Sequence, residues 1–415
     1  MFKGIFKTGL KKLKRILFTS FDGIPNEGQG GPNNIIYKIL TSLDREKFSS
    51  SFLSYKNYYK NIPGDFLNDV KPDFKKRMTD FLYYNSYLYR KITSAPSYLE
   101  KHFKTRDDYF FTYAEEKFDI IHSHDTLSCF YFANNKDSLR ILTIHGNGSI
   151  ENDWADAAKK NSFVKSYMHE LRRREINAFN SADIITFPGS YARDLFLDDY
   201  KGQLRNDKDI RVVNNGISRE EIALIKPGAV LSAANRSSAG HDIVLLNIAN
   251  HVRQKNIELL ISVIYELVKK GKNPLLINAG VGPLTDELKA LVKKHKLNRN
   301  VKFAGKLQHK EIIGLMKISD ALIMLSERVI FDLVMLEATA AGIPVISDTS
   351  GGNEEILSGY ENLLKIDRKD SIHISELILR DFYHSRKYFK SDNYDFKFTL
   401  KKMMNGYEEI YKTRK

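Results

Sequence analysis

The sequence predicts an α/β protein made of two Rossmann-like domains that face each other, each with a doubly wound parallel sheet. Three observations lead to this prediction. The chain of 415 residues is too long for one ordinary core. Strand-like and helix-like segments alternate in two successive series, which a polar, irregular segment at 218–241 separates. The first series opens with a strand, a glycine-rich loop and a helix, the usual beginning of a parallel α/β domain.

Composition and charge narrow the class of protein. Hydrophobic residues make up 42% and charged residues 28%, as in soluble globular proteins. The lone cysteine, Cys129, excludes an internal disulfide framework and fits a reducing compartment. No apolar run approaches the roughly 20 residues that span a bilayer, and the N-terminus lacks the apolar core of a secretory signal. We therefore expect a cytoplasmic protein.

The net charge of +14 favours anionic partners. The sequence contains no zinc-ligand spacing, no Walker loop and no nucleic-acid-binding motif. We therefore expect no bound metal, no cofactor and no nucleic acid. The anionic partners that remain to be considered are phosphorylated small molecules and membrane surfaces.

The first 15 residues have a basic, amphipathic pattern. Apolar residues occur at helical spacing between lysines: Phe2, Ile5, Phe6, Leu10 and Leu13. A helix of this kind can lie in an anionic membrane interface. An ordinary surface helix on the core, or a frayed terminus, fits the same pattern. Peripheral contact of residues 1–15 with the inner face of a membrane is thus one of two interpretations.

The first domain is predicted to alternate strands and helices. Residues 56–115 interrupt this alternation with many tyrosines and phenylalanines among basic residues, for which we predict an inserted set of helices. The insert suits plain helix packing, an acceptor-side wall or a membrane-facing surface. Predicted strands occupy 15–20, 118–124, 139–145, 182–189 and 209–217, and predicted helices 34–43, 163–181 and 190–197.

The second domain is predicted from the same alternation. Strands are expected at 241–249, 273–280, 300–307, 320–326 and 343–348, and helices at 256–271, 284–296, 309–319 and 331–342, with a last helix at 396–411. Ligands of such sheets bind beyond the carboxyl ends of the strands. The region where two such domains face each other is therefore the expected active site.

Residues 326–356 carry the clearest chemistry. A loop enters a helix at about Phe331, and Glu337 lies on that helix. A helix N-terminus presents free N–H groups and partial positive charge, which suits a phosphate. A carboxylate one or two turns further along can accept hydrogen bonds from ribose. Glu337 is too far into the helix to serve only as a partner of the helix dipole.

This segment resembles the retaining glycosyltransferases of family 4. The matching parts are LEATAAGIPVI and GGNEE. The resemblance implies that Glu337 binds the donor ribose and that Phe331, Asp332, Leu333 and Glu355 line the donor site. The first glutamate of the family's Glu-x7-Glu pair is replaced by Val329, and Glu327 is a substitute if the loop is rearranged.

A second match to family 4 lies at 248–261. In the family an arginine and a lysine hold the donor pyrophosphate. Lys255 matches the lysine, whereas Asn250 replaces the arginine and Arg253 is a substitute cation. Basic residues are unfavourable at a helix start, so a bound anion explains Lys255 better than a basic N-cap region does.

The first domain agrees with the resemblance. Gly30 and Gly31 lie in a loop similar to the family's first glycine loop, where backbone N–H groups can approach phosphate or acceptor. His145 ends a predicted strand, and family members often carry a histidine there, close to the donor sugar. His122 and His124 occur in the family-like segment IIHSHD.

The resemblance implies a GT-B fold and a sugar transfer from a nucleoside diphosphate to a glycan or glycolipid hydroxyl, with retention and without a metal. We expect an acceptor-side domain at 1–217, a nucleotide-sugar-binding domain at 218–390, and a helix in 391–415 that crosses back to the first domain. Surface polysaccharide or lipopolysaccharide synthesis is the expected pathway. A catalytically inactive GT-B partner and a nucleotide-sugar epimerase remain alternatives.

Overall fold

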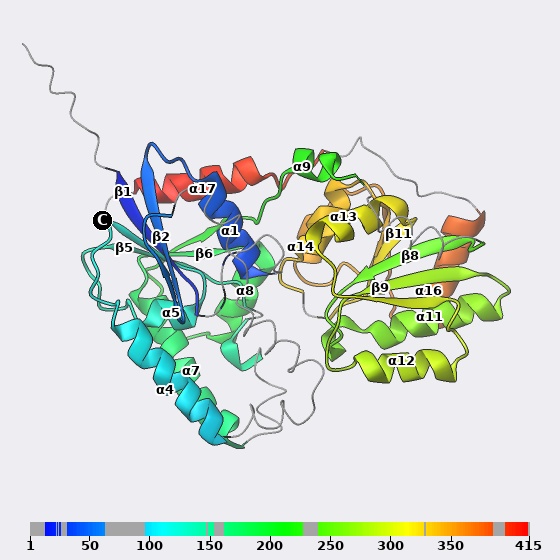
Figure 1. Ribbon diagram of the computed structural model, residues 1–415, viewed down its shortest axis with the longest axis horizontal. Coiled ribbons are helices and arrows are strands. Elements are labelled where there is room, and N and C mark those ends of the chain that lie inside the picture. The colour runs from blue at the N-terminus through cyan, green and yellow to red at the C-terminus, as the bar shows by residue number, and fades with distance from the viewer. Residues whose placement is uncertain are drawn as a thin grey trace, which may run out of the picture.

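Two parallel β-sheets, each covered by helices on both faces, build the two domains of the chain (Figure 1). The computed structural model describes residues 13–21, 23, 25, 31–62, 96–146, 148–152, 162–226, 240–327, 329–384 and 395–413. The predictions made for residues 1–12, for Gly30 and for 63–95 of the aromatic segment lie outside the described residues. The predicted fold class is confirmed.

The sheet of the first domain has seven strands in the order β3-β2-β1-β4-β5-β6-β7. All pairs are parallel except β2 with β3. The strands are β1 (Lys14–Thr19), β2 (Phe48–Ser54), β3 (Asn57–Tyr59), β4 (Ile120–Ser123), β5 (Leu139–Thr143), β6 (Ile184–Phe187) and β7 (Asp209–Val212). The strand order changes direction between β1 and β4, so this pair forms the topological switch point of the sheet.

Helices cover both faces of this first sheet. One face buries α1 and the C-terminal α17 against β1, β4 and β5, and the other buries α5, α7 and α8. The helices are α1 (Pro32–Ser42), α4 (Pro96–Phe111), α5 (Thr126–Phe130), α7 (Ser162–Ser181), α8 (Ser190–Asp199) and α17 (Leu400–Lys412).

The second domain has a six-stranded, fully parallel sheet in the order β10-β9-β8-β11-β12-β13. Its strands are β8 (Ile243–Ile248), β9 (Pro274–Ala279), β10 (Val301–Gly305), β11 (Ala321–Met324), β12 (Val345–Ser347) and β13 (Leu363–Lys365). This order is that of the dinucleotide-binding Rossmann fold, and its switch point lies between β8 and β11.

Two apolar layers enclose the second sheet. One contains α13, α14 and α15, and the other contains α11, α12 and α16. The helices are α9 (Arg219–Leu224), α11 (Ile257–Lys269), α12 (Thr285–Lys294), α13 (His309–Ile318), α14 (Leu333–Ala340), α15 (Asn353–Leu357) and α16 (Ser371–Ile378), which continues into a short π-helix, η3 (Leu379–His384).

The chain crosses between the domains twice, and the two crossings lie side by side. Ile217 N donates to Phe398 O at 3.1 Å, and Leu400 N donates to Ile217 O at 2.9 Å. A Cβ at Gly216 would lie 2.4 Å from Thr399 O, so this approach requires a glycine. Beyond the second crossing, α17 returns to the first domain and buries Tyr407 there (Figure 1).

Three local predictions are corrected. Residues 57–59 at the start of the predicted helical insert form β3, because they pair antiparallel with β2. The last helix begins at Leu400 and not at residue 396, because Phe396 and Phe398 pack into the second domain's core before the chain reaches the first domain. The expected irregular segment from 218 contains α9, which Ser218 caps by accepting from Glu221 N.

Candidate active site

The switch point of the second sheet brings two loops together, one after β8 and one after β11. Lys255 Nζ lies 3.5 Å from Asp332 Oδ2. Glu327 N donates to Gln254 O at 2.7 Å, which ties the backbones of the two loops to each other. Lys255 thus lies at the same edge of the sheet as Glu327 and Asp332, which are about 70 residues further along the chain.

Lys255 ends a short 3-10 helix, η2 (Arg253–Lys255), that precedes α11. The turn into α11 uses a left-handed Asn256 with φ of 50°. The Lys255 side chain is directed to the N-terminus of α14. Asp332 is the N-cap of this helix and accepts from Val334 N at 3.1 Å. Arg253 and Asn250 are exposed in the same loop. A cation therefore lies beside a helix N-terminus, the combination that binds anionic groups.

Glu337 lies one turn into α14 and is 5% exposed. Its Oε1 is 2.8 Å from Nε2 of His309, the first residue of α13. An ionised carboxylate can only accept, so His309 Nε2 carries the proton in this bond. Among the described residues no hydrogen bond reaches Glu337 Oε2, so this oxygen can accept from a ligand.

The double glycine before α15 is explained by a close backbone approach. A Cβ at Gly352 would lie 1.6 Å from Ile330 O, and Gly352 N donates to Val329 O at 2.8 Å. The Val329 side chain is buried at 5% exposure. The position that carries the first glutamate in family 4 is thus part of the packing, while Glu327 is exposed two residues earlier.

Glu355 contacts the first domain. Its Oε2 accepts from Ser190 N at 2.9 Å and from Ser190 Oγ at 3.1 Å, and its Oε1 accepts from Asn214 Nδ2 at 2.8 Å. Ser190 is the first residue of α8, so Glu355 acts on a helix N-terminus across the domain boundary. The loops after β6 and β12 therefore meet.

Phe331 and Leu333 take part in packing as well as in the loop. Phe331 is 8% exposed and lies against the ring of Phe398, with 5.5 Å between ring centroids. Leu333 is half-buried and contacts the apolar cores of both domains. Because their side chains are packed, both residues would contact a donor substrate mainly through backbone groups.

Three histidines gather at the carboxyl end of the first sheet. His145 Nε2 lies 3.1 Å from His124 Nδ1, and the rings of His124 and His122 are 4.2 Å apart. His122 Nδ1 lies 2.8 Å from the hydroxyl of Tyr411, and its Nε2 lies 2.7 Å from Thr143 Oγ1. The three histidines lie close together because β4 and β5, which they belong to or follow, are neighbouring strands.

Burial keeps these histidines uncharged. It lowers the pKa of His122 to about 3 and that of His145 to about 4, and the charge of His145 adds to the shift of His122. The pKa of His124 is held well below its usual value, first by burial and then by His122 and His145. One partner in the His124–His145 contact must donate and the other accept, so the tautomer of one ring determines that of the other.

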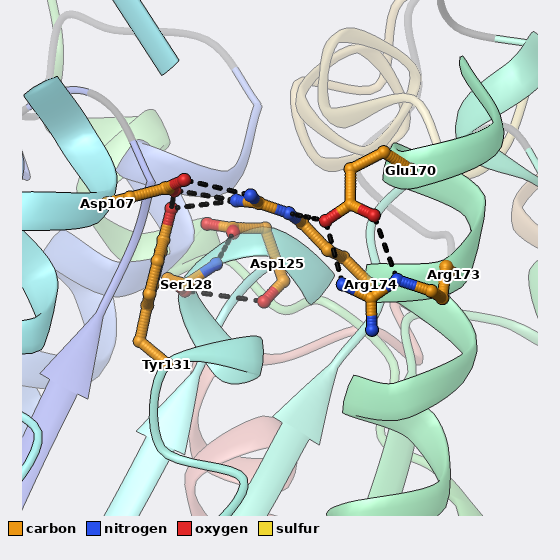
Figure 2. Close-up of polar contacts among 7 residues, drawn as sticks. All are labelled: Asp107, Asp125, Ser128, Tyr131, Glu170, Arg173 and Arg174. Atoms are coloured by element: carbon orange, nitrogen blue, oxygen red, sulfur yellow. Dashed lines mark hydrogen bonds and ion pairs between the residues drawn. The ribbon is translucent and has the colours of Figure 1, made fainter. Parts of the chain in front are cut away.

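Asp125 joins the two loops of the first switch point. It caps α5 by accepting from Ser128 N at 2.6 Å (Figure 2). It also accepts from Phe21 N at 2.6 Å. Gly31, the N-cap of α1 at the end of the first of these loops, has a φ of 69° and is exposed. The conformation, and not crowding, requires a glycine there.

A charged network fixes the helices behind this site. Arg174 of α7 forms a two-pronged pair with Asp107 of α4, at 2.6 and 2.8 Å, and also binds Glu170 at 2.8 Å (Figure 2). Tyr131 donates to the same Asp107 at 2.5 Å. Hydrogen bonds from Arg173 and Arg174 hold the pKa of Glu170 at about 2. The network joins the end of the aromatic segment to the domain core.

Two carboxylates, the half-buried Asp199 and the buried Glu175, hold the loop that follows His145. Ser149 N donates to Asp199 Oδ2 at 2.7 Å, and Ile150 N donates to Glu175 Oε2 at 2.8 Å. Glu175 is 4% exposed and also accepts from the hydroxyl of Tyr200. The backbone beyond His145 is thus fixed by groups on α7 and α8.

Sequence reasoning missed several partners of the predicted residues. Nothing in the segment HKEII marks His309 as the partner of Glu337, because the contact depends on packing of α13 against α14. Ser190 and Asn214, the partners of Glu355, lie beside turn residues at strand ends, which is the signal that could have singled them out.

The described residues contain no group of three or more His, Cys, Asp or Glu side chains that could hold a metal ion. No helix in the part of the chain that the structure covers has the length and hydropathy required to cross a bilayer.

Two doubly wound domains with charged loops at one switch point and histidines at the other define the GT-B class. Solved structures share this fold. The chain is similar to HepE of Anabaena in complex with UDP-glucose, with a TM-score of 0.66, 16% identity, and 96% of this chain and 99% of that chain covered. It is also similar to WaaG, a glycosyltransferase involved in lipopolysaccharide biosynthesis, with a TM-score of 0.59, 14% identity, and 96% and 95% covered.

Family models divide the chain between them. The model described as "Glycosyltransferase Family 4" matches residues 63–221, and the model described as "Glycosyl transferases group 1" matches residues 233–390. This protein belongs to the family 4 glycosyltransferases of group 1. The first match runs through 63–115, so the family model covers most of the aromatic insert, although the motifs that carry the resemblance lie outside it.

A curated relative agrees with this assignment. An uncharacterised glycosyltransferase of Methanocaldococcus jannaschii is 26% identical over 258 residues, which are 60% of this chain and 62% of the relative. The match thus spans about three fifths of the relative's length.

Proposed function

We propose that this protein is a glycosyltransferase that moves a sugar from a nucleoside diphosphate to an acceptor hydroxyl, with retention of the anomeric configuration. The observation that carries the proposal is the grouping at the β8/β11 switch point. Lys255 lies at the N-terminus of α14, and Glu337 lies one turn further along the same helix. These groups match a pyrophosphate and a ribose in that order.

Lys255 would stabilise the departing diphosphate. In the structure its ammonium group faces Asp332, 28% and 11% of the two side chains being exposed. A bound pyrophosphate would replace this weak contact with charge-assisted hydrogen bonds from Lys255, from Leu333 N and from the nearby Arg253. These groups supply positive charge where negative charge develops, so we propose that the reaction needs no metal and no cofactor.

The bonds and protons balance without a further reactant. The bond from the anomeric carbon to the phosphate oxygen breaks, and the bond to the acceptor oxygen forms on the same face. The acceptor's proton passes to an oxygen of the departing phosphate. A neutral His145 would hydrogen-bond the sugar or its phosphate, and the exposed Glu327 would take the place of the family's first glutamate.

The donor base, the pathway and the acceptor come from the comparisons. HepE was solved with UDP-glucose, which supports a uridine diphosphate sugar as donor. WaaG acts in lipopolysaccharide biosynthesis, which supports a glycan or glycolipid acceptor of the bacterial surface. Such an acceptor would require a cytoplasmic enzyme to work at the inner face of the membrane, and residues 1–15 are our proposed contact there.

A catalytically inactive GT-B partner protein is the second candidate. Two observations favour it: Val329 is buried where the family has a glutamate, and Glu355 is engaged with Ser190 and Asn214. Such a protein would bind a nucleotide sugar or a partner without turning the sugar over.

The test has two stages. Thermal unfolding is measured with a panel of UDP-, GDP- and ADP-sugars, where a ligand at 100 times its dissociation constant stabilises by roughly 2.7 kcal/mol. The sugar that stabilises is then incubated with protein and with glycan or glycolipid acceptors, and products are analysed by mass and by NMR of the anomeric proton. Binding without hydrolysis or transfer would favour the inactive partner, and an inverted product would refute retention.

A further inference from the structure

An unbroken basic stretch follows the middle of α12. Residues 289–310 contain seven lysines and one arginine and no aspartate or glutamate, although the whole chain has 65 basic and 51 acidic residues. We call this set the lysine surface: Lys289, Lys293, Lys294, Lys296, Arg299, Lys302, Lys306 and Lys310. Its charge is therefore more than half of the chain's net +14.

All eight side chains of the lysine surface are exposed. They lie on the second half of α12, on the turn that follows, on the edge strand β10 and on the loop to α13. Figure 1 shows α12 at the lower border of the second domain. Within the described residues none of the eight forms an ion pair.

Acidic groups beside this stretch have other partners or lie in the first turn of α12, where, within the described part of the chain, Asp286 comes one turn before Lys289 without pairing with it. Glu311 accepts from Gln308 N at 2.7 Å, and Glu266 of α11 pairs with Lys269 at 3.3 Å. Asp286 and Glu287 lie in the first turn of α12, where the helix dipole favours them. The positive charge of the lysine surface is thus not neutralised by its neighbours.

Ordinary structural reasons explain only part of this set. The helix dipole favours Lys293 and Lys294 in the last turn of α12. Lysines on an edge strand prevent pairing with other chains, which explains Lys302. Neither reason explains the cations of the intervening turn, or the lack of acidic residues over the whole stretch. Like charges this close repel one another, and an anionic partner removes that cost.

The residue types indicate which anionic partner. Seven of the eight cations are lysines, which act as point charges, whereas nucleic-acid recognition favours arginine and exposed aromatic rings. The large hydrophobic side chains that are exposed in the described residues, Leu13, Phe111, Leu224 and Ile372, all lie elsewhere. Groups of four to eight exposed lysines and arginines are typical of proteins that bind anionic lipid.

We propose that the lysine surface binds the face of an anionic phospholipid bilayer through electrostatic attraction, without insertion. The contact goes beyond the proposed transfer reaction, because it needs neither nucleotide sugar nor acceptor. It would hold the second domain against the membrane and is separate from the proposed contact of residues 1–15.

The test uses the full chain and two matched quadruple variants. In the first, Lys293, Lys294, Arg299 and Lys302 are changed to Gln. In the control, Lys201, Lys397, Lys401 and Lys402, which are exposed outside the lysine surface, are changed to Gln. Both lose four positive charges. Sedimentation is measured with vesicles of phosphatidylcholine with phosphatidylglycerol, and of phosphatidylcholine alone, at low and high salt.

The first variant is expected to bind the anionic vesicles about a hundredfold more weakly or worse, since each cation near such a surface contributes about fivefold. The control should change less than about threefold, because the field falls off within a Debye length. High salt should release the unaltered chain, and vesicles of phosphatidylcholine alone should not bind it.

Several outcomes would overturn the proposal. Equal losses in both variants would mean that only net charge matters. Unchanged vesicle binding in the first variant, with loss on deleting residues 1–12, would place the contact at the N-terminus. Binding to single-stranded DNA that exceeds vesicle binding, and that the first variant loses, would identify a nucleic-acid surface. Thermal stabilisation by nucleotide sugar is measured in all variants, so a failure of the proposed function is detected separately.

Discussion

The two switch points, one at the carboxyl end of each sheet, differ in the charge of the side chains they gather. At the first, burial holds His122, His124 and His145 neutral. At the second, Lys255 faces Asp332 and the Glu337 carboxylate faces His309. The same α/β topology has thus placed neutral, desolvated histidines at one edge and a partly exposed lysine–aspartate pair at the other.

This difference shows how the work of the reaction can be divided. A diphosphate needs positive charge, which the second domain places at a helix N-terminus. A sugar and a hydroxyl acceptor are uncharged, and they need hydrogen-bonding groups of fixed orientation, which the first domain supplies.

Replacing His145 with Ala should reduce turnover and spare donor binding. If the ring hydrogen-bonds the sugar or its phosphate in the transition state, kcat should fall by about a hundred- to a thousandfold. Steady-state kinetics give kcat, and calorimetry gives the donor's dissociation constant. His169→Ala, on the exposed side of α7, is the control. A donor that binds much more weakly to the His145 variant would place this histidine on the phosphate side.

Acidification should destabilise the protein through the first switch point. The folded-state pKa values of His122 and His124 lie below the unfolded value of about 6.5, so below that pH the unfolded chain binds more protons. Stability should be constant above pH 6.5 and fall below it. From pH 7 to 5.5 the free energy of unfolding should therefore fall, by about 1 kcal/mol for each histidine that stays uncharged when folded. Urea unfolding at both pH values measures this, and equal stabilities would show that the histidines titrate in the folded protein as they do in the unfolded chain.

Removing the cation at the second switch point should weaken binding of the diphosphate. Lys255→Ala is expected to cost about 1.5–3 kcal/mol in affinity for the nucleotide sugar and little for the nucleoside. Calorimetry with both ligands makes the comparison, with Lys269→Ala at the other end of α11 as the control. Should both ligands weaken equally, Lys255 does not lie at the pyrophosphate.

The smallest effect is expected for Glu337→Gln. Glutamine keeps one acceptor oxygen and replaces the other with a donating NH2 group, so only one of the contacts to His309 and ribose is kept. The loss should be about 1 kcal/mol, close to that of one neutral hydrogen bond. For the deoxyribose form of the donor, the variant and the unaltered protein should bind with equal affinity. Glu354→Gln, whose carboxylate is 75% exposed, is the control. Unchanged donor affinity in the Glu337 variant would contradict the ribose assignment.

The sequence predicted those elements whose apolar pattern is unbroken. The strand at β8 and the helix α11 agree with their predicted ranges to within a few residues, because each has a continuous apolar side. The strand β2 was missed, since FSSSFLS gives serines where a buried strand usually has valine or isoleucine. Its place between β1 and β3 buries those serines.

Site residues were predicted only where one local segment suggests a role. Lys255 and Glu337 each lie in such a segment; in the structure Lys255 faces the N-cap of α14 and Glu337 lies on that helix, while their roles stay predictions. The partner of Glu337 is 28 residues away in the chain and that of Glu355 is 165 residues away. Packing between helices and between domains brings these distant residues into contact, and no local sequence pattern encodes that packing.

The paired crossings at Ile217 and Thr399 restrict how the two domains can move. The two segments run parallel and are hydrogen-bonded to each other, with a glycine at the point of closest approach. A single connecting strand would let one domain swivel freely about it, whereas a doubled strand resists torsion. Relative motion of the domains is then restricted to hinge bending about one axis that passes through the two segments. Closing over a ligand and opening again would follow the same arc, with Glu355 and Ser190 on the edge that meets.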